Sequence, residues 1–422
     1  MQQRFEGKQE PIITRVDPLA TLDGPSAETM NFLNEVIGRY PKAISFAAGR
    51  PPNAHVPTAD APRWLERFIA HRAERTGTTI DQARVYVGQY SDTGGIIQDL
   101  VAKMLKAEGD GEIAPQKIMM ANGFQEALLI HLIRLARRGG AIVALDPTYV
   151  GLQGGAMAAG VPLYAATSPG DRVEALSHAL RRARADGHNA VAVYVIPDFD
   201  NPTGHRMSLA ARRALLTLAE TEDVLIFEDS AYRFFDYADA QLPSLLSLDT
   251  LGRVVHLGTF SKMFFPGVRI GFAATKSNDP RLMAEAIAIK SFTSVATSPI
   301  AQAITGGFLL EAEFQVSQWN ATRRDFCAAN RDALDDALTR HLGDVGLRWT
   351  KPEGGFFTVA ELPFAIDETD ATVMARDHGI IATPMSFFSP SGGARREIRF
   401  AFSNLVPETI DRGIERFAGY VR

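Results

Sequence analysis

The chain has 422 residues, of which 46% are hydrophobic and 22% charged, and its formal net charge is −5. This composition is close to that of an average soluble globular protein and excludes a disordered, collagen-like or coiled-coil chain. The Lys and Arg residues are scattered, which gives no basic footprint for nucleic acid. The single cysteine, Cys327, cannot form an internal disulfide or a thiolate zinc cluster and favours a reducing compartment.

The N-terminal stretch MQQRFEGKQEPIITR is polar and lacks the apolar core of a signal peptide. No stretch approaches the roughly 18 apolar residues that a membrane span needs. We therefore expect a cytoplasmic protein that binds neither membrane nor nucleic acid. At roughly 150 residues per domain, the length favours two to three domains.

The first 45 residues predict a polar arm with a short helix at Ala27–Gly38. From about Lys117, apolar runs alternate with amphipathic stretches that predict helices at 125–137, 172–185 and 209–220. Seven such runs predict strands, namely KIMMANG, AIVALDP, VPLYAA, AVAVYVIPDF, VLIFEDS, VVHLGTFS and RIGFAAT. Continuous apolar strands that alternate with helices are typical of an α/β fold, with a mostly parallel, here seven-stranded, sheet covered on both faces.

After about Lys290 the pattern changes. A helical region over 300–339 precedes LRWTKPEGGFFTVAELP, a helix at 371–378 and the strand REIRFAF. This mixed order predicts a smaller α+β domain. We divide the chain into an arm at 1–45 that packs with the small domain, a large domain at 46–310 and a small domain at 311–422.

Several familiar kinds of site are absent from the sequence. The segment GLQGGAMAAG lacks the G-x-G-x-x-G spacing of a dinucleotide loop and favours a helix. There is no P-loop and no G-x-S-x-G elbow, and the nine histidines show no metal-ligand spacing. We expect no metal site.

Lys262 lies in the turn GTFSKMFFPGVRIG, among apolar residues that would lower the pKa of its amine. An amine of that kind can form a Schiff base with an aldehyde, although a solvated loop lysine would fit the same segment. Asp229 ends the apolar run VLIFEDS, where a buried carboxylate needs a partner such as a protonated pyridine nitrogen. Tyr232 follows three residues later and could contact the same ligand.

Asn201 begins the turn NPTG directly after another predicted strand, so its amide would stand at the mouth of the sheet. An ordinary turn explains the same residues. Gly123, Phe124 and Gln125 open a helix after a strand, where free N–H groups can cradle a phosphate. A plain helix start is the alternative.

Arg269 and the hydroxyls of Thr259 and Ser261 could complete that cradle. Together these residues describe a ligand with an aldehyde, a pyridine nitrogen, a ring hydroxyl and a phosphate. That ligand is pyridoxal 5′-phosphate (PLP).

From about Ile44 to Leu405 the chain resembles the class I/II aminotransferases of the PLP fold type I family, in which the NPTG turn, the D-x-x-Y motif and the lysine turn with its following arginine occur in this order. The resemblance implies that Lys262 binds the cofactor aldehyde, that Asp229 pairs the ring nitrogen, and that Asn201 and Tyr232 contact the ring hydroxyl. The catalytic set is then Lys262, Asp229 and Tyr232. The phosphate would be held by Gly123, Phe124, Gln125, Thr259, Ser261 and Arg269.

The same resemblance implies roles for four further positions. Tyr149 would stack on the cofactor ring, and Tyr90 would reach the phosphate of a neighbouring subunit, which implies a homodimer with shared active sites. Arg399, with Asn201 and Gly49, would bind the substrate, an amino acid or a 2-oxo acid. In REIRFAF the alternation places Arg399 on the opposite face from its apolar neighbours.

The branch to which the chain is most similar is the aminoadipate and MocR-like one, on the segments ISFAAGRPP, QYSDTGG, FEDSAYRFF and PEGGFF. Within that branch, the segments MNFLNEV, RYPKAISFAAGRP and GGIIQDL are similar to transaminases that make hydroxyphenylglycines. The chain departs from the family at Phe124, Asp200, Gln98-Asp99-Leu100 and Met263-Phe264-Phe265. The implied function is transfer of an amino group between an amino acid, aromatic or apolar, and a 2-oxo acid, in amino acid or secondary metabolism.

Two alternatives stay open at this point. One is a PLP enzyme of natural-product biosynthesis that uses the same cofactor for elimination, replacement, cyclisation, C–C bond formation or oxidation. The other is a MocR-type effector-sensing domain, for which the 45 residues before the match are few and not basic.

Overall fold

The computed structural model describes residues 11–17, 35–167, 170–188, 191–238 and 240–422. Residues 27–34 of the helix predicted at 27–38 lie outside the described residues, and 35–39 are helical. Among the helices of the described part, none is long and apolar enough to cross a membrane.

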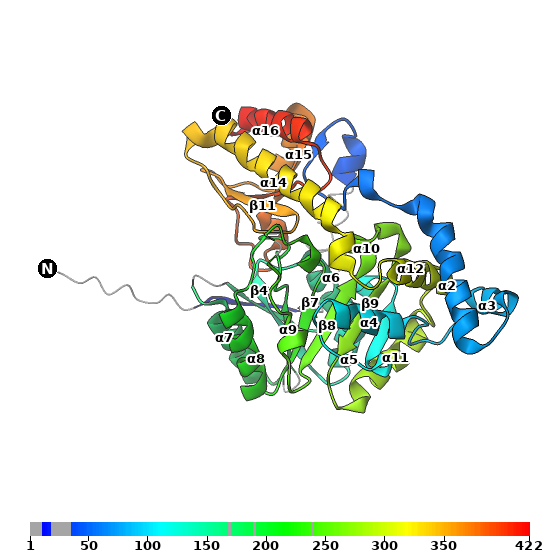
Figure 1. Cartoon of the computed structure of the whole chain (residues 1–422). Helices are drawn as coiled ribbons and strands as arrows, with labels where there is room; N and C mark the ends of the chain where they lie inside the picture. Colours follow the sequence, from blue (N-terminus) through cyan, green and yellow to red (C-terminus); the bar gives the residue numbers. More distant parts are fainter. Residues whose placement is uncertain (1–10, 18–34, 168–169, 189–190, 239) are drawn as a thin grey trace.

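A large sheet forms the centre of the lower part of the molecule (Figure 1). Its strand order is β1-β5-β4-β6-β7-β8-β9-β3. The neighbouring strands from β5 to β8 in this order are parallel to one another. β1 pairs antiparallel with β5, and β9 pairs antiparallel with both β8 and β3. The strands are β1 (Ile13–Val16), β3 (Ile118–Ala121), β4 (Ala141–Asp146), β5 (Leu163–Thr167), β6 (Val191–Val195), β7 (Leu225–Asp229), β8 (Val254–Thr259) and β9 (Gly271–Thr275).

This arrangement confirms the predicted mostly parallel α/β sheet and its seven strands in the region 118–275. The sheet has eight strands rather than seven, because β1 adds to the free edge of β5. Its central strands are buried on both faces. In β4, Ile142 packs into one apolar core and Val143 into the other, which explains the continuous apolar runs in the sequence.

Helices cover both faces of the sheet. One core contains side chains of α5 (Phe124–Ala136), α6 (Val150–Ala159) and α11 (Pro280–Thr293). The other contains side chains of α7 (Arg172–Ala185), α8 (Leu209–Thr221), α9 (Leu245–Leu248) and α10 (Phe260–Met263). The predicted helices at 125–137, 172–185 and 209–220 are confirmed within one residue at each end, and GLQGGAMAAG is helical as expected.

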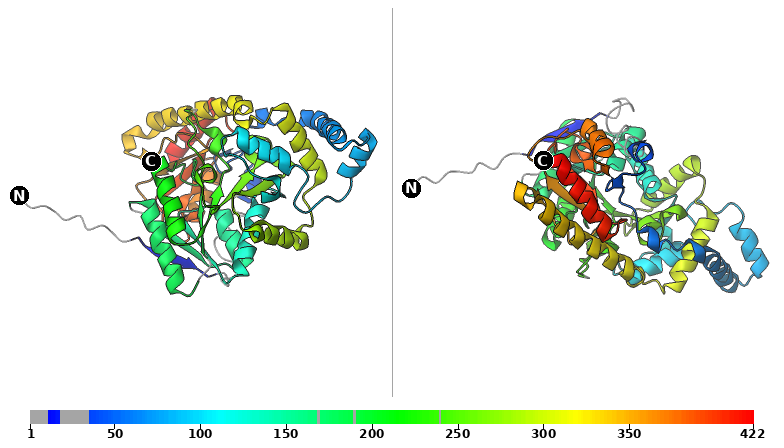
Figure 2. Two further views of the ribbon diagram at one scale, coloured as in Figure 1. Left: turned by 60° about the horizontal axis from the view of Figure 1, so that its bottom comes forward. Right: turned by 90° about the horizontal axis from the view of Figure 1, so that it is seen from above.

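Three helices that the sequence pattern did not predict lie before the first large-sheet strand of this region. They are α2 (Ala61–Thr76), α3 (Ile80–Val87) and α4 (Gln98–Ala107). In both views of Figure 2 the first two, in blue, project from one side of the molecule. The backbone of α2 packs directly on α12 (Pro299–Glu311), where a Cβ on Gly307 would lie 1.8 Å from the Trp64 carbonyl oxygen.

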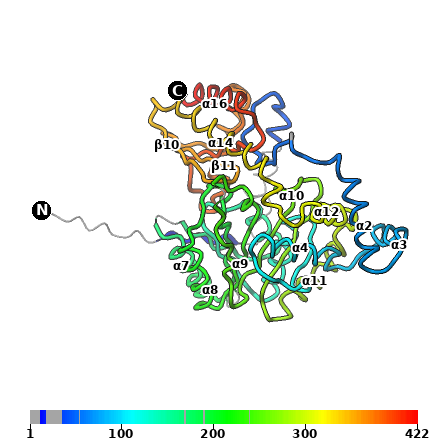
Figure 3. The backbone as a smooth tube through the Cα atoms, viewed as in Figure 1, coloured from blue at the N-terminus to red at the C-terminus, as the bar shows by residue number. Residues whose placement is uncertain are grey.

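The predicted helical region 300–339 is divided into α12, α13 (Val316–Trp319) and α14 (Ala321–Leu342). Glu313 and Phe314 adopt positive φ angles of 48° and 66°, which turn the chain out of the helical path between α12 and α13. The tube in Figure 3 shows α14 leading from the large sheet to the upper lobe.

The upper lobe is an α+β unit, as predicted. Its antiparallel sheet has the order β10-β11-β14-β13. The elements are β10 (Arg348–Trp349), β11 (Phe357–Glu361), β13 (Thr383–Pro384), β14 (Glu397–Ala401), α15 (Glu368–Asp377) and α16 (Pro407–Val421). Together with α14 they bury a separate apolar core that includes Phe46 from the N-terminal segment.

The N-terminal segment is shared between the two lobes, which differs from the expectation that the whole arm packs with the small domain. β1 pairs with β5 of the large sheet, since that edge strand offers unpaired backbone groups. β2 (Ile44–Ser45) instead pairs with β12 (Ile380–Ile381) of the upper lobe. The domain boundaries at 45/46 and 310/311 stay predictions.

Candidate active site

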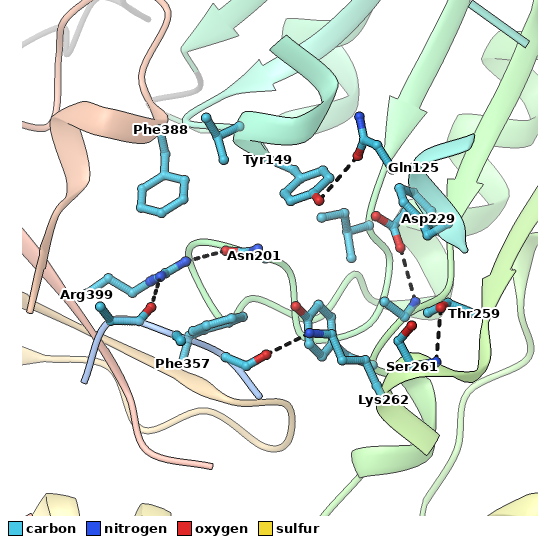
Figure 4. A pocket seen from close by; sticks show the side chains of 18 of the residues that line it. Gln125, Tyr149, Asn201, Asp229, Thr259, Ser261, Lys262, Phe357, Phe388 and Arg399 are labelled. Carbon is cyan, nitrogen blue, oxygen red and sulfur yellow. Dashed lines mark hydrogen bonds between the residues drawn. The ribbon is translucent and has the colours of Figure 1, made fainter. Parts of the chain in front are cut away.

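A pocket of about 280 Å³ lies at the carboxyl ends of the parallel strands, between the large sheet and the upper lobe (Figure 4). This is where open α/β sheets bind ligands. Twelve of the residues singled out from the sequence line it, namely Gly49, Phe124, Gln125, Tyr149, Asn201, Asp229, Tyr232, Thr259, Ser261, Lys262, Arg269 and Arg399.

Lys262 extends into the pocket from α10, a short helix that begins where β8 ends. The Thr259 hydroxyl caps this helix by accepting the N–H of Ser261 at 3.1 Å, which fixes the turn that carries the lysine. The Lys262 Nζ donates to the Gly49 carbonyl oxygen at 2.6 Å. Burial is the main cause that lowers the pKa of the amine to about 8; the charge of Asp229 acts in the opposite direction, and the nearby arginines act with burial.

Asp229 is the last residue of β7 and is 4% exposed. Burial raises the pKa of its carboxyl group to about 7, despite two hydrogen bonds that favour the charged form. The Ala231 N–H donates to Oδ1 at 3.1 Å, and the Tyr194 hydroxyl donates to Oδ2 at 2.6 Å. Glu228 points to the other face, as the alternation predicts, and accepts the N–H groups of Leu245 and Leu246.

Arg399 enters the pocket from β14 of the upper lobe. Its Nη1 donates to Asn201 Oδ1 and its Nη2 to the Ala47 carbonyl oxygen, both at 2.6 Å. The centres of the Phe357 and Phe388 rings each lie 4.4 Å from the guanidinium carbon of Arg399, and the two rings hold the guanidinium in place. The Nε of Arg399 is buried without a hydrogen-bond partner. Ile398 and Phe400, the neighbours of Arg399 on the strand, pack into the core of the upper lobe on the opposite face, as predicted.

Asn201 thus connects the two lobes, because it is also hydrogen-bonded to the Tyr232 hydroxyl. Burial raises the pKa of Tyr232 well above its ordinary value, so this phenol stays protonated at neutral pH. The Lys262 Nζ lies 5.8 Å from the centre of the Tyr232 ring. Tyr149 stands opposite, and its hydroxyl donates to Gln125 Oε1 at 3.4 Å.

A concave, positively charged corner is formed where α5 begins. Gly123 has a φ of +85°, and a Cβ there would lie 2.4 Å from Nη2 of Arg269. The Arg269 Nη1 donates to the Ser261 hydroxyl at 3.3 Å. The helix N-terminus and the arginine therefore face one small space suited to an anion.

Two predicted site residues are not among those that line the pocket of this chain. Gly123 precedes α5 and lies beside the Arg269 guanidinium, next to the pocket wall. Tyr90 lies in the segment between α3 and α4 and is 89% exposed. The role expected for Tyr90 is at the active site of a neighbouring subunit, and it stays a prediction.

Two of the departures from the family lie near the site. Asp200 is paired with Arg172 at 3.5 Å and accepts a hydrogen bond from the Thr203 hydroxyl at 2.8 Å. The ring of Phe264 stacks on that of Phe308 behind α10.

Sequence reasoning missed three residues of the site. Tyr194 bonds Asp229, while Phe357 and Phe388 enclose Arg399. Tyr194 left a readable signal, because it is the one polar-tipped residue in the apolar run VAVYV, and a buried phenol needs a partner. Phe357 and Phe388 left no local signal, since aromatic residues are common in cores.

The comparisons with known proteins agree with this geometry. Residues 48–417 match the family model "Aminotransferase class I and II". The chain belongs to the class I and II aminotransferases. The aminotransferase is 36% identical to the (S)-3,5-dihydroxyphenylglycine transaminase of Amycolatopsis orientalis over 411 residues, which cover 95% of this chain and 93% of the relative.

Two solved structures share the fold of the aminotransferase over nearly its whole length. The kynurenine aminotransferase of Pyrococcus horikoshii, in complex with PMP, has a TM-score of 0.79 at 28% identity and 95% coverage of each chain. The α-aminoadipate aminotransferase LysN of Thermus thermophilus, complexed with N-(5′-phosphopyridoxyl)-L-leucine, has a TM-score of 0.78 at 25% identity, covering 94% of this chain and 96% of that one. Family and neighbours imply that the aminotransferase depends on PLP.

Proposed function

We propose that the pocket holds PLP and that the enzyme transfers the amino group of an aromatic or apolar amino acid to a 2-oxo acid. The observation that carries this proposal is the meeting of an amine, a buried carboxylate, an amide–phenol pair and an anion corner in one cavity. Those four groups match the aldehyde, the ring nitrogen, the ring hydroxyl and the phosphate of the cofactor.

The residues present fit that group. The absence of a Cβ at Gly123 lets the Arg269 guanidinium lie against the start of α5, where it supplies the positive charge. Asp229 would pair the ring nitrogen, Tyr149 would cover the ring, and Asn201 with Tyr232 would bond the ring hydroxyl. Phe124, Gln125, Thr259 and Ser261 line the remaining wall next to the corner.

When bound, the cofactor supplies the electron-withdrawing ring that makes loss of the substrate α-proton possible. Lys262 is the group placed to bind the aldehyde and then, once released as a free amine, to take and return that proton. The lowered pKa of Lys262, about 8, keeps a larger share of the amine neutral near pH 7–8 than in an exposed lysine. The charge of Asp229 is opposite to that of Lys262, and the Asp229 carboxylate would orient the cofactor ring through its nitrogen.

Arg399 is placed to bind the substrate carboxylate. Its two Nη atoms point into the pocket and its Nε has no partner, so a carboxylate would find a guanidinium already held by Phe357 and Phe388. The walls nearby are apolar, with Ile37, Ala47, Ala48 and Val150. These walls, and the aromatic substrates printed in the names of two relatives, support an aromatic or apolar side chain.

The test is to mix the purified, PLP-loaded enzyme with single amino acids and a 2-oxo acid acceptor, and to follow both products by mass spectrometry. We expect a 2-oxo acid from the donor and a new amino acid from the acceptor in equal amounts, with aromatic and apolar donors ahead of acidic ones. Release of ammonia without amination of the acceptor would contradict transamination. Preference for an acidic donor would contradict the proposed substrate class.

Replacing Arg399 should weaken substrate binding without loss of the cofactor. In Arg399→Met we expect kcat/KM for both the amino acid and the oxo acid to fall by roughly 10²–10³, because a desolvated charge pair is lost. The visible absorption of the bound cofactor should not change. Arg396→Met, at an exposed arginine three positions earlier, is the matched control and should behave like the unmodified enzyme; equal losses in both variants would contradict the assignment.

We also propose that the enzyme works as a homodimer with shared active sites. Four large side chains are exposed: Tyr90 after α3, Phe292 in α11, Val295 between α11 and α12, and Ile300 in α12. An apolar set of this kind supports an interface between two copies. Tyr90 would then reach the phosphate of the neighbouring subunit.

A further inference from the structure

Tyr194 makes the shortest of the contacts to the carboxylate of Asp229 but lines no wall that the cofactor ring would touch. Its hydroxyl oxygen lies 2.6 Å from Asp229 Oδ2. Charge-assisted O–H···O⁻ bonds are about 2.5–2.7 Å long, shorter than bonds between neutral groups. The length therefore fits a phenol that donates to an ionised carboxylate.

The sheet fixes this contact. β6 and β7 are parallel neighbours in which Tyr194 is level with Phe227. Side chains two residues apart on a strand share a face, so Asp229 projects on the same side as Phe227 and Tyr194. Tyr194 is 2% exposed and Asp229 is 4% exposed, so the bond forms away from solvent.

Tyr194 is a permanent donor. Burial and the neighbouring carboxylate raise the pKa of its phenol well above 10. The other donor to Asp229 is the Ala231 N–H, to Oδ1 at 3.1 Å. One oxygen of the carboxylate is thus held by the backbone and the other by Tyr194, which leaves the lone pairs toward the pocket for the ring nitrogen.

We propose that Tyr194 is a positioning residue that holds Asp229 ionised and correctly oriented for the ring nitrogen of the cofactor. The inference rests on the proposed cofactor. Tyr194 acts only through Asp229, and its hydrogen bond stabilises the charged form of a buried carboxylate that solvent cannot stabilise.

Other charged or titratable groups act on this pair through their charge. They are Lys262 from α10, Tyr149 before α6, Asp200 after β6, Tyr232 after β7 and, from the opposite face of the sheet, His256 of β8. All of them stay in place when only the Tyr194 hydroxyl is removed, so a comparison of variants isolates that hydroxyl.

The test measures the dissociation constant of pyridoxamine 5′-phosphate for the cofactor-free protein between pH 5.5 and 9. This probe has the ring nitrogen and the phosphate but no aldehyde, so titration of Lys262 does not enter through covalent bonding. In Tyr194→Phe we expect binding about tenfold weaker at pH 7, as for loss of a hydrogen bond to a charged group.

The pH dependence should change in a fixed direction. The Tyr194 hydrogen bond favours the ionised carboxylate and so lowers the pKa of Asp229, which removal of the hydroxyl must raise. As the pH is lowered, the affinity of Tyr194→Phe for pyridoxamine 5′-phosphate should therefore begin to fall at a higher pH than that of the unmodified protein.

The matched control is Tyr164→Phe. Tyr164 is a buried tyrosine of β5 in the same sheet, and its hydroxyl also donates to a carboxylate, Asp186, at 2.9 Å, but outside the pocket. We expect it to leave both the affinity and its pH dependence unchanged. A loss of affinity equal to that in Tyr194→Phe would indicate a general effect on the sheet and overturn the inference.

A second variant keeps the test decisive. In Asp229→Asn the pH dependence that Asp229 contributes should disappear, and adding Tyr194→Phe should then change the affinity by less than twofold. A full tenfold effect in that background would show that Tyr194 does not act through Asp229. Unmodified protein that fails to bind the probe would overturn the proposed cofactor, whereas normal binding by both it and Tyr194→Phe would overturn only the role of Tyr194.

Discussion

Lys262→Ala should abolish turnover and leave the cofactor bound non-covalently. The amine is the one group in the pocket placed both to bind the aldehyde and to move the substrate α-proton, so we expect kcat to fall by at least about 10⁴. Asp229 and the corner at Gly123 are untouched, and they should retain the cofactor. Single-turnover assays and the cofactor absorption of the dialysed protein measure the two effects separately.

The control for this variant is Lys276→Ala. Lys276 follows β9, which is antiparallel to β8, so that Lys276 lies at the opposite end of the strands from the pocket. Its Nζ donates to the Ser247 carbonyl oxygen. Its loss should leave turnover unchanged. Borohydride reduction followed by peptide mass mapping should place the cofactor on Lys262 in the unmodified enzyme. Turnover by Lys262→Ala, or a label on another lysine, would contradict the assignment.

Asp229→Ala should have the next largest effect, because it removes one side of a buried charge pair. The cost of breaking such a pair is about 3–5 kcal/mol, which corresponds to a loss of about 10²–10⁴ in kcat/KM. Cofactor affinity should fall as well, since the ring nitrogen loses its partner. Kinetics at saturating cofactor, together with a binding isotherm, distinguish the two contributions.

Asp223→Ala provides the matched comparison. Asp223 is an exposed carboxylate just before β7, at the other end of the strand that carries Asp229, and it is paired with Arg253 at 2.7 Å. We expect a change of less than about 0.5 kcal/mol in stability and none in turnover. If Asp229→Ala were equally mild, the buried carboxylate would have no role in the reaction.

The apolar runs of the sequence predicted the seven strands between 118 and 275, because strands buried on both faces need such runs. The amphipathic pattern predicted α5, α7 and α8, whereas the short helices α9 and α10 were not predicted. The sequence pattern predicted neither the helices α2, α3 and α4 nor the pairing of β1 with β5. An edge pairing depends on which partner strand is free, and that is decided far away in the sequence.

For the site, the sequence by itself determined which residues end the strands, and hence an amine, a carboxylate and an amide at one edge of the sheet. Lys262, Asp229 and Asn201 could be found because each lies where a predicted strand ends, and open α/β sheets bind ligands at the carboxyl ends of their strands. Together with the predicted phosphate cradle at Gly123 and Arg269, the chemical types of these three groups predict the cofactor.

Only the tertiary structure decided how the groups are held. The bonds from Lys262 to Gly49, from Arg399 to Asn201 and from Tyr194 to Asp229 join residues 213, 198 and 35 positions apart. The run VAVYV shows that the Tyr194 phenol needs a partner, but the identity of the partner in each contact leaves no local pattern, because the residues lie far apart in the sequence. Local sequence therefore specifies which chemistry reaches the sheet edge, whereas packing of the two lobes specifies its geometry and its pKa values.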